Sequence, residues 1–200
     1  MKSPLRYQAT RYDCGPTSML NAIIFLFERE EIPPDIVRHI GLCTLDGYDR
    51  YGHCGMTGTT GAAMRYFGDW LNELRHAGLL PVESEYIEKE EVHLKEDGKL
   101  YKILAGGGVA IDHVFHDVGH YILLTGLCEC GVKAFDPYYR GNEVQREGVK
   151  VVRDRPLECN IILPFEVLED TWRGYYSMGE TDTREALLIG RADKDILYMI

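Results

Sequence analysis

Cys14 stands where a long apolar helix is predicted to begin, and a thiol in that position can act as a nucleophile. Asp13 is a suitable N-cap residue, Pro16 is tolerated in a first helical turn, and residues 17–30 carry apolar side chains at helical spacing. The helix dipole and the free N–H groups of a first turn favour negative charge, so they lower the pKa of a thiol there. The sequence therefore predicts an activated Cys14, against the alternative of a small buried apolar residue.

His120 and Asp136 lie at the ends of two successive predicted strands. His120 comes directly before the apolar run 121–127, and Asp136 directly follows the apolar run 132–135. If these runs form a hairpin, the carboxylate lies beside the imidazole, where it fixes the tautomer and supports an imidazolium. Taken singly, a strand-capping histidine and an Asp-Pro turn explain the same residues. Their order along the chain together with Cys14 favours a catalytic triad.

Gln8 completes the predicted site, because it lies six residues before Cys14. Its side-chain amide can donate to a developing oxyanion beside the backbone N–H of Cys14. In the predicted mechanism the thiolate attacks an amide carbonyl, and His120 protonates the leaving amine and then activates water. The predicted catalytic residues are therefore Cys14, His120, Asp136 and Gln8.

Four motifs in this chain occur in the same order in a known family. They are Gln8, the segment Asp13-Cys14-Gly15-Pro16-Thr17-Ser18, the segment Gly119-His120-Tyr121, and Asp136-Pro137 with Gly141 soon after. In these motifs, which span residues 8 to 141, the chain resembles the double-glycine leader (bacteriocin-processing) peptidases and their stand-alone relatives. Those proteins are papain-like cysteine peptidases.

The resemblance implies a papain-like fold, with the nucleophile at the start of a central N-terminal helix that packs on a C-terminal antiparallel sheet. It implies the oxyanion donor at Gln8, the nucleophile at Cys14, the base at His120 and the orienting carboxylate at Asp136, with no cofactor. Members of the family usually precede a membrane exporter, whereas this chain has no P-loop and adds a Gly- and Tyr-rich loop at 44–60. A peptide or amide substrate is expected, and a double-glycine leader is not carried over.

Two alternatives to a cysteine peptidase stay open. The same thioester intermediate can pass its acyl group to an amine, which would make the chain an acyltransferase. A third hypothesis is a peptide-binding module that keeps the cleft without catalysis. The presence of Cys14, His120 and Asp136 together argues against that module, because binding alone does not need all three.

Other clusters of metal-binding residue types are weaker signals. His113, His116 and His120 have the spacing of one helix face, yet they run from a predicted strand into a loop, so no metal site is predicted there. We interpret His113 and His116 as solvated loop residues or as residues at the mouth of the cleft. Cys128-x-Cys130 and His53-Cys54 could each provide two of the four ligands of a zinc site, but neither has a convincing second pair.

Helices in the first part of the chain and strands in the second must position these residues. Helices are predicted at 17–30, 35–42, 60–76 and 97–105, and strands at 82–94, 109–114, 121–127, 132–135, 149–152 and 159–163. This order predicts one α+β domain over residues 1–200, with a helical half at about 1–80 and a sheet half at about 81–164. The pattern does not place the extension at about 165–200, although 186–189 and 196–200 are apolar.

Composition limits the classes of partner. The net charge is −10 with no basic patch, so neither nucleic acid nor an anionic membrane surface is an expected partner. The longest apolar run, 22–27, is too short to cross a bilayer, and the N-terminus has no signal-peptide pattern. Six irregularly spaced cysteines without such a signal predict reduced thiols and a cytoplasmic location. The oligomeric state is not predicted.

Overall fold

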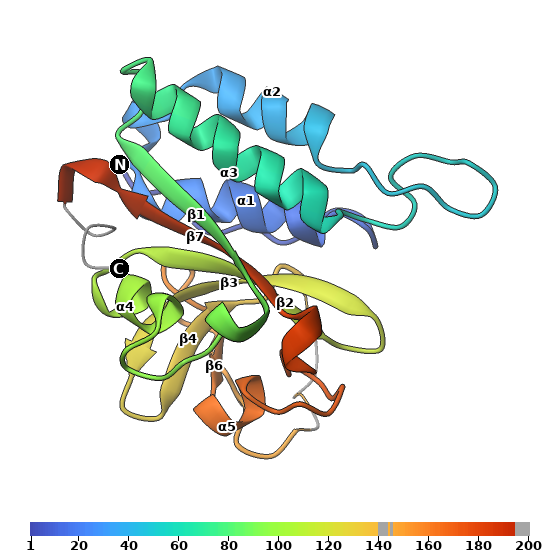
Figure 1. Ribbon diagram of the computed structural model, residues 1–200. Helices are drawn as coiled ribbons and strands as arrows, with labels where there is room; N and C mark the ends of the chain where they lie inside the picture. Colours follow the sequence, from blue (N-terminus) through green and yellow to red (C-terminus); the bar gives the residue numbers. More distant parts are fainter. Residues whose placement is uncertain (140–143, 145, 195–200) are drawn as a thin grey trace.

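The computed structural model of the chain describes residues 1–139, 144 and 146–194 (Figure 1). Gly141, which contributes to the family resemblance, and the apolar piece 196–200 lie outside the described residues. The described part combines helices with a single sheet (Figure 1). This arrangement confirms the predicted α+β class.

Seven strands form the sheet in the order β1-β7-β2-β3-β4-β6-β5, and every neighbouring pair is antiparallel. Their bounds are Val82–Glu88 for β1, Val109–Phe115 for β2, Gly119–Cys128 for β3, Gly131–Phe135 for β4, Lys150–Val151 for β5, Ile161–Leu163 for β6 and Glu185–Arg191 for β7. The hairpin of β3 and β4 is the one predicted to carry His120 and Asp136.

Helices cover both faces of this sheet (Figure 1). One face carries α1 (Cys14–Leu26), α2 (Pro34–Cys43) and α3 (Gly61–His76), and the other carries α4 (Lys99–Ala105) and α5 (Phe165–Leu168). Helix α1 packs directly on the sheet and is buried on most of its circumference. Its broad apolar surface therefore reflects a central position between the sheet and the other two helices.

Two hydrophobic cores form because alternate residues of each central strand point to opposite faces. Ile111 and Leu123 pack in the core beneath α1, α2 and α3. Ala110 and Leu124, their chain neighbours, pack in the core on the side of α4 and α5. The near-continuous apolar runs of β2 and β3 follow from this burial on both faces.

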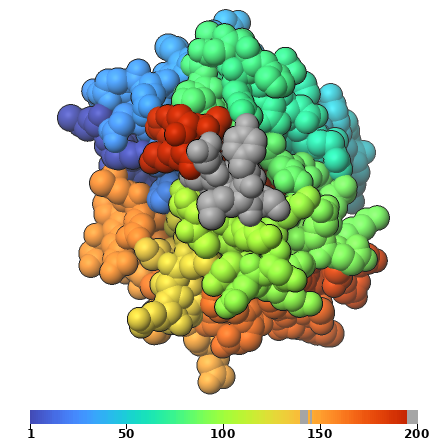
Figure 2. Space-filling view, turned by 60° about the vertical axis from the view of Figure 1, so that its left-hand side comes forward, coloured from blue at the N-terminus to red at the C-terminus, as the bar shows by residue number. Residues whose placement is uncertain are grey.

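Strand β7 gives the C-terminal region a central place in the sheet, although the sequence pattern treated residues 165–200 as an extension. Leu187 pairs with Tyr86 of β1 on one side and with Ile111 of β2 on the other. In Figure 2 the red end of β7 lies beside the blue N-terminal segment. A hydrogen bond joins the two regions, since the Arg191 Nη2 atom donates to Glu31 Oε1 at 2.9 Å. The C-terminal region thus joins β1 to the rest of the sheet.

The element boundaries differ from the predicted ones at several places. Helix α1 begins at Cys14 and ends at Leu26, whereas 17–30 was predicted, and β1 ends at Glu88 rather than at residue 94. The helix ends early because Phe27 adopts an extended backbone. Within the described ranges, no helix combines the length and apolar character needed to span a bilayer.

Candidate active site

Cys14 is the first residue of α1, and its side chain is buried. Asp13 occupies the N-cap position but does not cap the helix with its side chain, contrary to the prediction. Its carboxylate instead accepts hydrogen bonds from the backbone N–H groups of Ala9 and Thr10 at 2.9 and 2.7 Å. Because Asp13 is used in this way, the N–H groups of the first turn are left available for an anion near Cys14.

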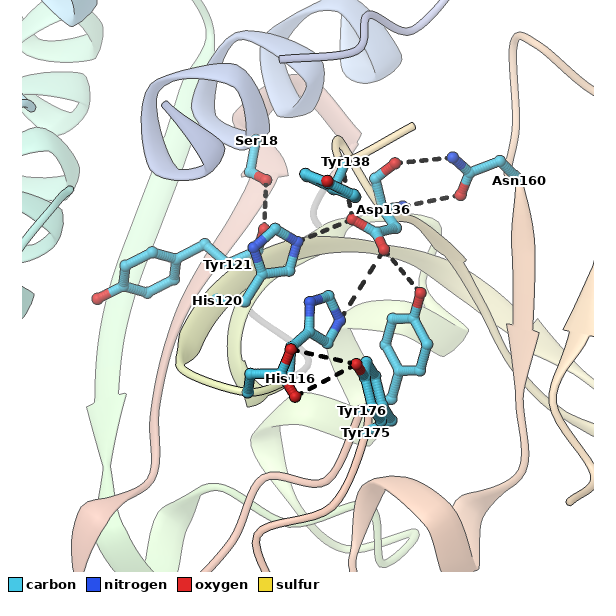
Figure 3. A network of polar contacts seen from close by, with 10 residues as sticks. Ser18, His116, His120, Tyr121, Asp136, Tyr138, Asn160, Tyr175 and Tyr176 are labelled. Carbon is cyan, nitrogen blue, oxygen red and sulfur yellow. Dashed lines mark hydrogen bonds and ion pairs between the residues drawn. The ribbon is translucent and has the colours of Figure 1, made fainter. Parts of the chain in front are cut away.

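Ser18 fixes α1 against the strand that carries His120. It lies one helical turn after Cys14, and its hydroxyl donates to the Tyr121 carbonyl oxygen at 3.1 Å (Figure 3). Tyr121 directly follows His120 in β3. One buried hydrogen bond between residues 103 positions apart therefore sets the distance between the start of the helix and the start of the strand.

Gly15 is required because the loop at 44–60 crosses the N-terminus of α1. A Cβ atom on Gly15 would lie 2.2 Å from Thr59 Oγ1, which is too close for any side chain. Thr59 itself donates to the Thr44 carbonyl oxygen at 2.6 Å. The base of this loop is thus anchored beside the residue that follows the candidate nucleophile.

His120 and Asp136 lie side by side at the open end of the β3–β4 hairpin. The Nε2 atom of His120 is 2.8 Å from Asp136 Oδ1, and both side chains are buried. The Cys14 thiol lies near enough to the same imidazole for each group to shift the pKa of the other. Since Nε2 faces the carboxylate, the Nδ1 atom is the nitrogen left for the sulfur. The structure therefore brings together three of the four residues that the sequence singled out.

Further hydrogen bonds hold the Asp136 carboxylate in place (Figure 3). Its Oδ1 atom accepts from the backbone N–H of Tyr138 at 2.8 Å, and its Oδ2 atom accepts from the Tyr176 hydroxyl at 2.6 Å. The Asn160 side chain binds both backbone groups of Asp136, at 2.8 and 2.7 Å. This carboxylate is therefore fixed from both sides before any substrate arrives.

These contacts shift the pKa values of all three groups. Burial alone would raise the pKa of the Cys14 thiol, but the contact with His120 and the N–H groups of Tyr121 and Gly15 lower it overall. Burial alone would lower the pKa of His120, but Asp136 and Cys14 raise it to about 9. Burial likewise opposes ionisation of Asp136, yet His120 keeps the pKa of that carboxyl well below its ordinary value. The cluster thus favours the charged form of each group, namely a thiolate, an imidazolium and a carboxylate.

Gln8 lies beside this cluster with its amide partly engaged. Its backbone N–H donates to the carbonyl oxygen of Pro137, the residue after Asp136, at 2.8 Å. Its Nε2 atom donates to the Thr10 carbonyl oxygen at 2.7 Å, and its Oε1 atom is buried without a partner among the described residues. An amide nitrogen carries two hydrogens, so one remains for another acceptor. The predicted oxyanion role of Gln8 stays a prediction.

His116 lies against the cluster, so its interpretation as a solvated loop residue is wrong, whereas a place at the mouth of the cleft stays a prediction. Its ring stacks on that of His120, with centroids 4.2 Å apart, and its Nε2 atom is 3.9 Å from Asp136 Oδ2. His113 is also mostly enclosed, and burial lowers its pKa. The potential ligand atoms of His116, His120 and Asp136 lie within 4.8 Å of one another, which would suit a cation. Hydrogen bonds already occupy the carboxylate, so we assign no metal there.

Sequence reasoning did not find Ser18, Asn160 or Tyr176 as parts of this site. Asn160 and Tyr176 reach Asp136 from 24 and 40 residues further along the chain, and no local pattern marks them. Tyr176 has a backbone φ of +64°, an unusual value for a bulky residue, but that signal exists only in the structure. Ser18 belongs to the motif at 13–18, but no sequence pattern assigned it a role in positioning His120. Its polar side chain does not single it out, because Thr17 and Asn21 are also buried polar residues of the same helix.

No protein-family model matches the chain, and no curated protein matches it either.

Proposed function

We propose that this chain is a cysteine-dependent hydrolase of peptide or amide bonds, with Cys14 as the nucleophile. The observation that carries the proposal is the buried chain of contacts from the Cys14 thiol through His120 to Asp136. Each group has the pKa shift that its role requires, and the nucleophile lies at a helix N-terminus. The order of helices and antiparallel sheet agrees with the papain-like fold that the sequence resemblance implies.

The proposed reaction begins from the thiolate–imidazolium pair. The Cys14 sulfur attacks the substrate carbonyl, and the negative oxygen that develops accepts hydrogen bonds from the backbone N–H of Cys14 and from Gln8. His120 gives its proton to the leaving amine, which leaves a thioester on Cys14. Neutral His120 then removes a proton from water, and hydroxide releases the acyl group. Asp136 holds the imidazole in the required orientation throughout.

A pocket lies beside Asp136, and its lining includes neither Cys14 nor His120, so it is a neighbour of the reacting groups and not the place of reaction. Tyrosines form much of its lining, together with Asn160, Arg153 and a group of aliphatic residues; the tyrosines are Tyr7, Tyr138, Tyr139 and Tyr176. Tyr7 and Tyr139 contact each other edge to face, with centroids 5.1 Å apart. Aromatic rings with polar ends suit extended peptide chains, because they supply both apolar contact and hydrogen bonds. The tyrosine-rich lining supports a peptide as the substrate, with part of the chain bound beyond the reacting bond.

Alkylation by iodoacetamide tests the activated thiol without any knowledge of the substrate. At about pH 6 an ordinary thiol is almost fully protonated, so only a residue with a lowered pKa reacts quickly. We expect Cys14 to be labelled much faster than Cys54, an exposed thiol, although Cys14 is the more buried. Tryptic peptides separate the two, because Cys14 lies in peptide 12–29 and Cys54 in peptide 51–65. Equal, slow labelling of both would favour a non-catalytic peptide-binding module.

Turnover of a mixture of short peptides, followed by mass spectrometry, tests the hydrolysis itself. Cys14→Ala should reduce cleavage by at least about 10³-fold, because the acyl-enzyme can no longer form. The matched control Cys54→Ser should cleave as the wild type does. An added amine distinguishes acyl transfer from hydrolysis, since a transferase converts cleaved peptide into its amide. Full cleavage by Cys14→Ala would refute the proposed nucleophile.

A further inference from the structure

A pair of thiols lies at the closed end of the β3–β4 hairpin, and the open end of the same hairpin carries His120 and Asp136. The Sγ atoms of Cys128 and Cys130 are 3.3 Å apart and share a hydrogen bond. Cys130 is exposed and Cys128 is partly exposed, and the hairpin tip around them (yellow in Figure 2) lies at the molecular surface. We propose that Cys128 and Cys130 form a redox-active dithiol, which exchanges with small-molecule disulfides to give an intramolecular disulfide.

The backbone holds the two sulfurs in this arrangement. Cys128 pairs with Gly131 as the last pair of the β3–β4 ladder, so only two residues form the turn. Gly131 has a φ of +137°, and a Cβ atom on it would lie 2.1 Å from the Leu163 carbonyl oxygen. The turn is therefore packed closely against β6. A disulfide bond is about 2.05 Å long, so the sulfurs need to approach by only about 1.2 Å.

The two thiols differ in a way that assigns their roles. Burial and the hydrogen bond with Cys130 raise the pKa of Cys128, which lowers the fraction of Cys128 present as a thiolate. Cys130 is the more exposed of the two and is the thiol that a disulfide in solution can reach. Cys130 is therefore the attacking residue and Cys128 the resolving residue. The positive charge of Lys133 lies near enough to Cys128 to favour its ionisation in the second step.

The exchange balances in two steps. The Cys130 thiolate attacks one sulfur of the small disulfide, which forms a mixed disulfide on Cys130 and releases one thiolate. Cys128 then loses its proton to solvent and attacks the Cys130 sulfur, which forms the Cys128–Cys130 bond and releases the second thiolate. The protein thereby loses two protons and two electrons, and the small disulfide takes up both to become two thiols. No metal or other co-reactant takes part.

Neither of two other thiols in the structure has this arrangement. Cys54 is exposed, and its Sγ atom donates to the Leu45 carbonyl oxygen at 3.3 Å rather than to another thiol. Cys159 is only 1% exposed, and burial raises its pKa. Cys54 therefore serves as the matched control, because a small disulfide can reach it but no neighbouring thiol can resolve the product.

Incubation of the full chain with oxidised glutathione, followed by alkylation and tryptic mass mapping, tests the proposal. Peptide 103–133 contains Cys128 and Cys130 and no other cysteine. We expect it to lose two hydrogens and to take up no alkylating reagent, whereas peptide 51–65 should carry glutathione on Cys54. In Cys128→Ser the glutathione adduct on Cys130 should persist, and in Cys54→Ser the disulfide should form as in the wild type.

Two results would overturn the dithiol assignment. One is a wild-type peptide 103–133 that stays fully alkylatable under conditions where Cys54 is modified. The other is a glutathione adduct on Cys130 that persists although Cys128 is present, because a resolving thiol at this distance should displace it. The test reads a peptide mass and not hydrolysis, so its outcome does not depend on the function proposed for Cys14.

Discussion

Asp136 and Asp112 are two carboxylates buried in the same sheet, and they differ in what surrounds them. Asp136 is 2% exposed and Asp112 is 0% exposed. The oxygens of Asp136 accept hydrogen bonds from His120, Tyr138 and Tyr176. Neither oxygen of Asp112 has a hydrogen-bond partner of ordinary geometry among the described residues, although the N–H of its neighbour His113 points toward the carboxylate.

The difference shows that partners, rather than depth of burial, decide the charge of a buried acid. Burial raises the pKa of Asp112 well above its ordinary value, and the favourable charge of Arg184 only partly opposes this. Burial acts on Asp136 in the same direction, but the adjacent imidazole outweighs it and lowers the pKa. Asp136 is therefore an anion that can orient His120, whereas Asp112 is held as a neutral acid inside the apolar core around β2.

The same substitution at both positions gives the largest expected contrast. In Asp136→Asn the imidazole loses its anionic partner, so peptide cleavage should fall by about 10⁴-fold, as expected for the orienting acid of a triad. The pKa of His120 should also fall from about 9 toward its ordinary value, because Asp136 is the first of the two groups that raise it. Cleavage measured over a pH series checks both effects, since the imidazolium is lost as pH rises through the His120 pKa.

Asp112→Asn is the matched control for this activity measurement. Asp112 lies on the face of β2 that packs away from α1, in the core of α4 and α5, so the change should leave cleavage within about twofold. Equal losses of cleavage in the two variants would mean that a buried carboxylate is needed for folding only, and Asp136 would lose its assigned role.

Asp112→Asn should increase the stability of the fold at neutral pH, although it leaves cleavage nearly unchanged. The folded protein must keep Asp112 protonated, so its contribution to stability is present below the unfolded pKa of about 3.9 and is lost as pH rises toward the raised folded value. An amide has no such cost, so the variant should be more stable by about 2–3 kcal/mol at neutral pH and equal to the wild type below about pH 4. Urea denaturation at both pH values measures this difference.

A neutral-pH stability that does not rise in Asp112→Asn would contradict the view of Asp112 as an unpaired acid. Asp136→Asn tests the reverse case, since a lowered pKa stabilises the fold above the unfolded value. That variant should be less stable than the wild type at neutral pH, and the difference should shrink as pH falls below about 3.9.

Part of this contrast could be predicted from sequence. Cys14, His120 and Asp136 each carry a local signal, namely a helix start, the first residue of an apolar strand and the residue after one. Asp112 carries a signal too, because it interrupts the apolar run of β2. The local sequence pattern shows that a polar residue is buried, but it does not show which hydrogen-bond or charged partners surround that residue.

The place of β7 in the sheet and the partners of Asp136 depended on contacts between residues that are distant in the sequence. The strand β7 follows β6 along the chain, yet it pairs with β1 and β2 on the far side of the sheet. No turn or repeat near residues 185–191 specifies those partners; they follow from burying both faces of one sheet. Tyr176 and Asn160 were not predicted for the same reason. Their role is to bind Asp136, and this depends on where the folded chain places them.

Tyr176→Phe is the smallest change and tests how much one partner of Asp136 contributes. It removes the 2.6 Å hydrogen bond to Oδ2 and keeps the ring, which contacts His116 edge to face with centroids 4.7 Å apart. A hydrogen bond to a charged group contributes about 1.5–3 kcal/mol, so we expect a loss of about 1.5 kcal/mol at neutral pH in urea denaturation. Cleavage should fall by less than about tenfold, because His120 and Tyr138 still hold Asp136 ionised.

The adjacent Tyr175→Phe is the matched control for this variant. The Tyr175 hydroxyl lies 3.3 Å from both carboxylate oxygens of the exposed Asp117, and solvent can replace that contact. Its loss should cost less than about 0.5 kcal/mol. The Tyr176→Phe deficit should also fade as the pH is lowered toward the pKa of Asp136, since protonation removes the charge that the hydroxyl stabilises. If the two variants lost the same stability and the loss did not change with pH, the effect would come from ring packing. The Tyr176 hydroxyl would then have no part in keeping Asp136 charged, and His120 would do so alone.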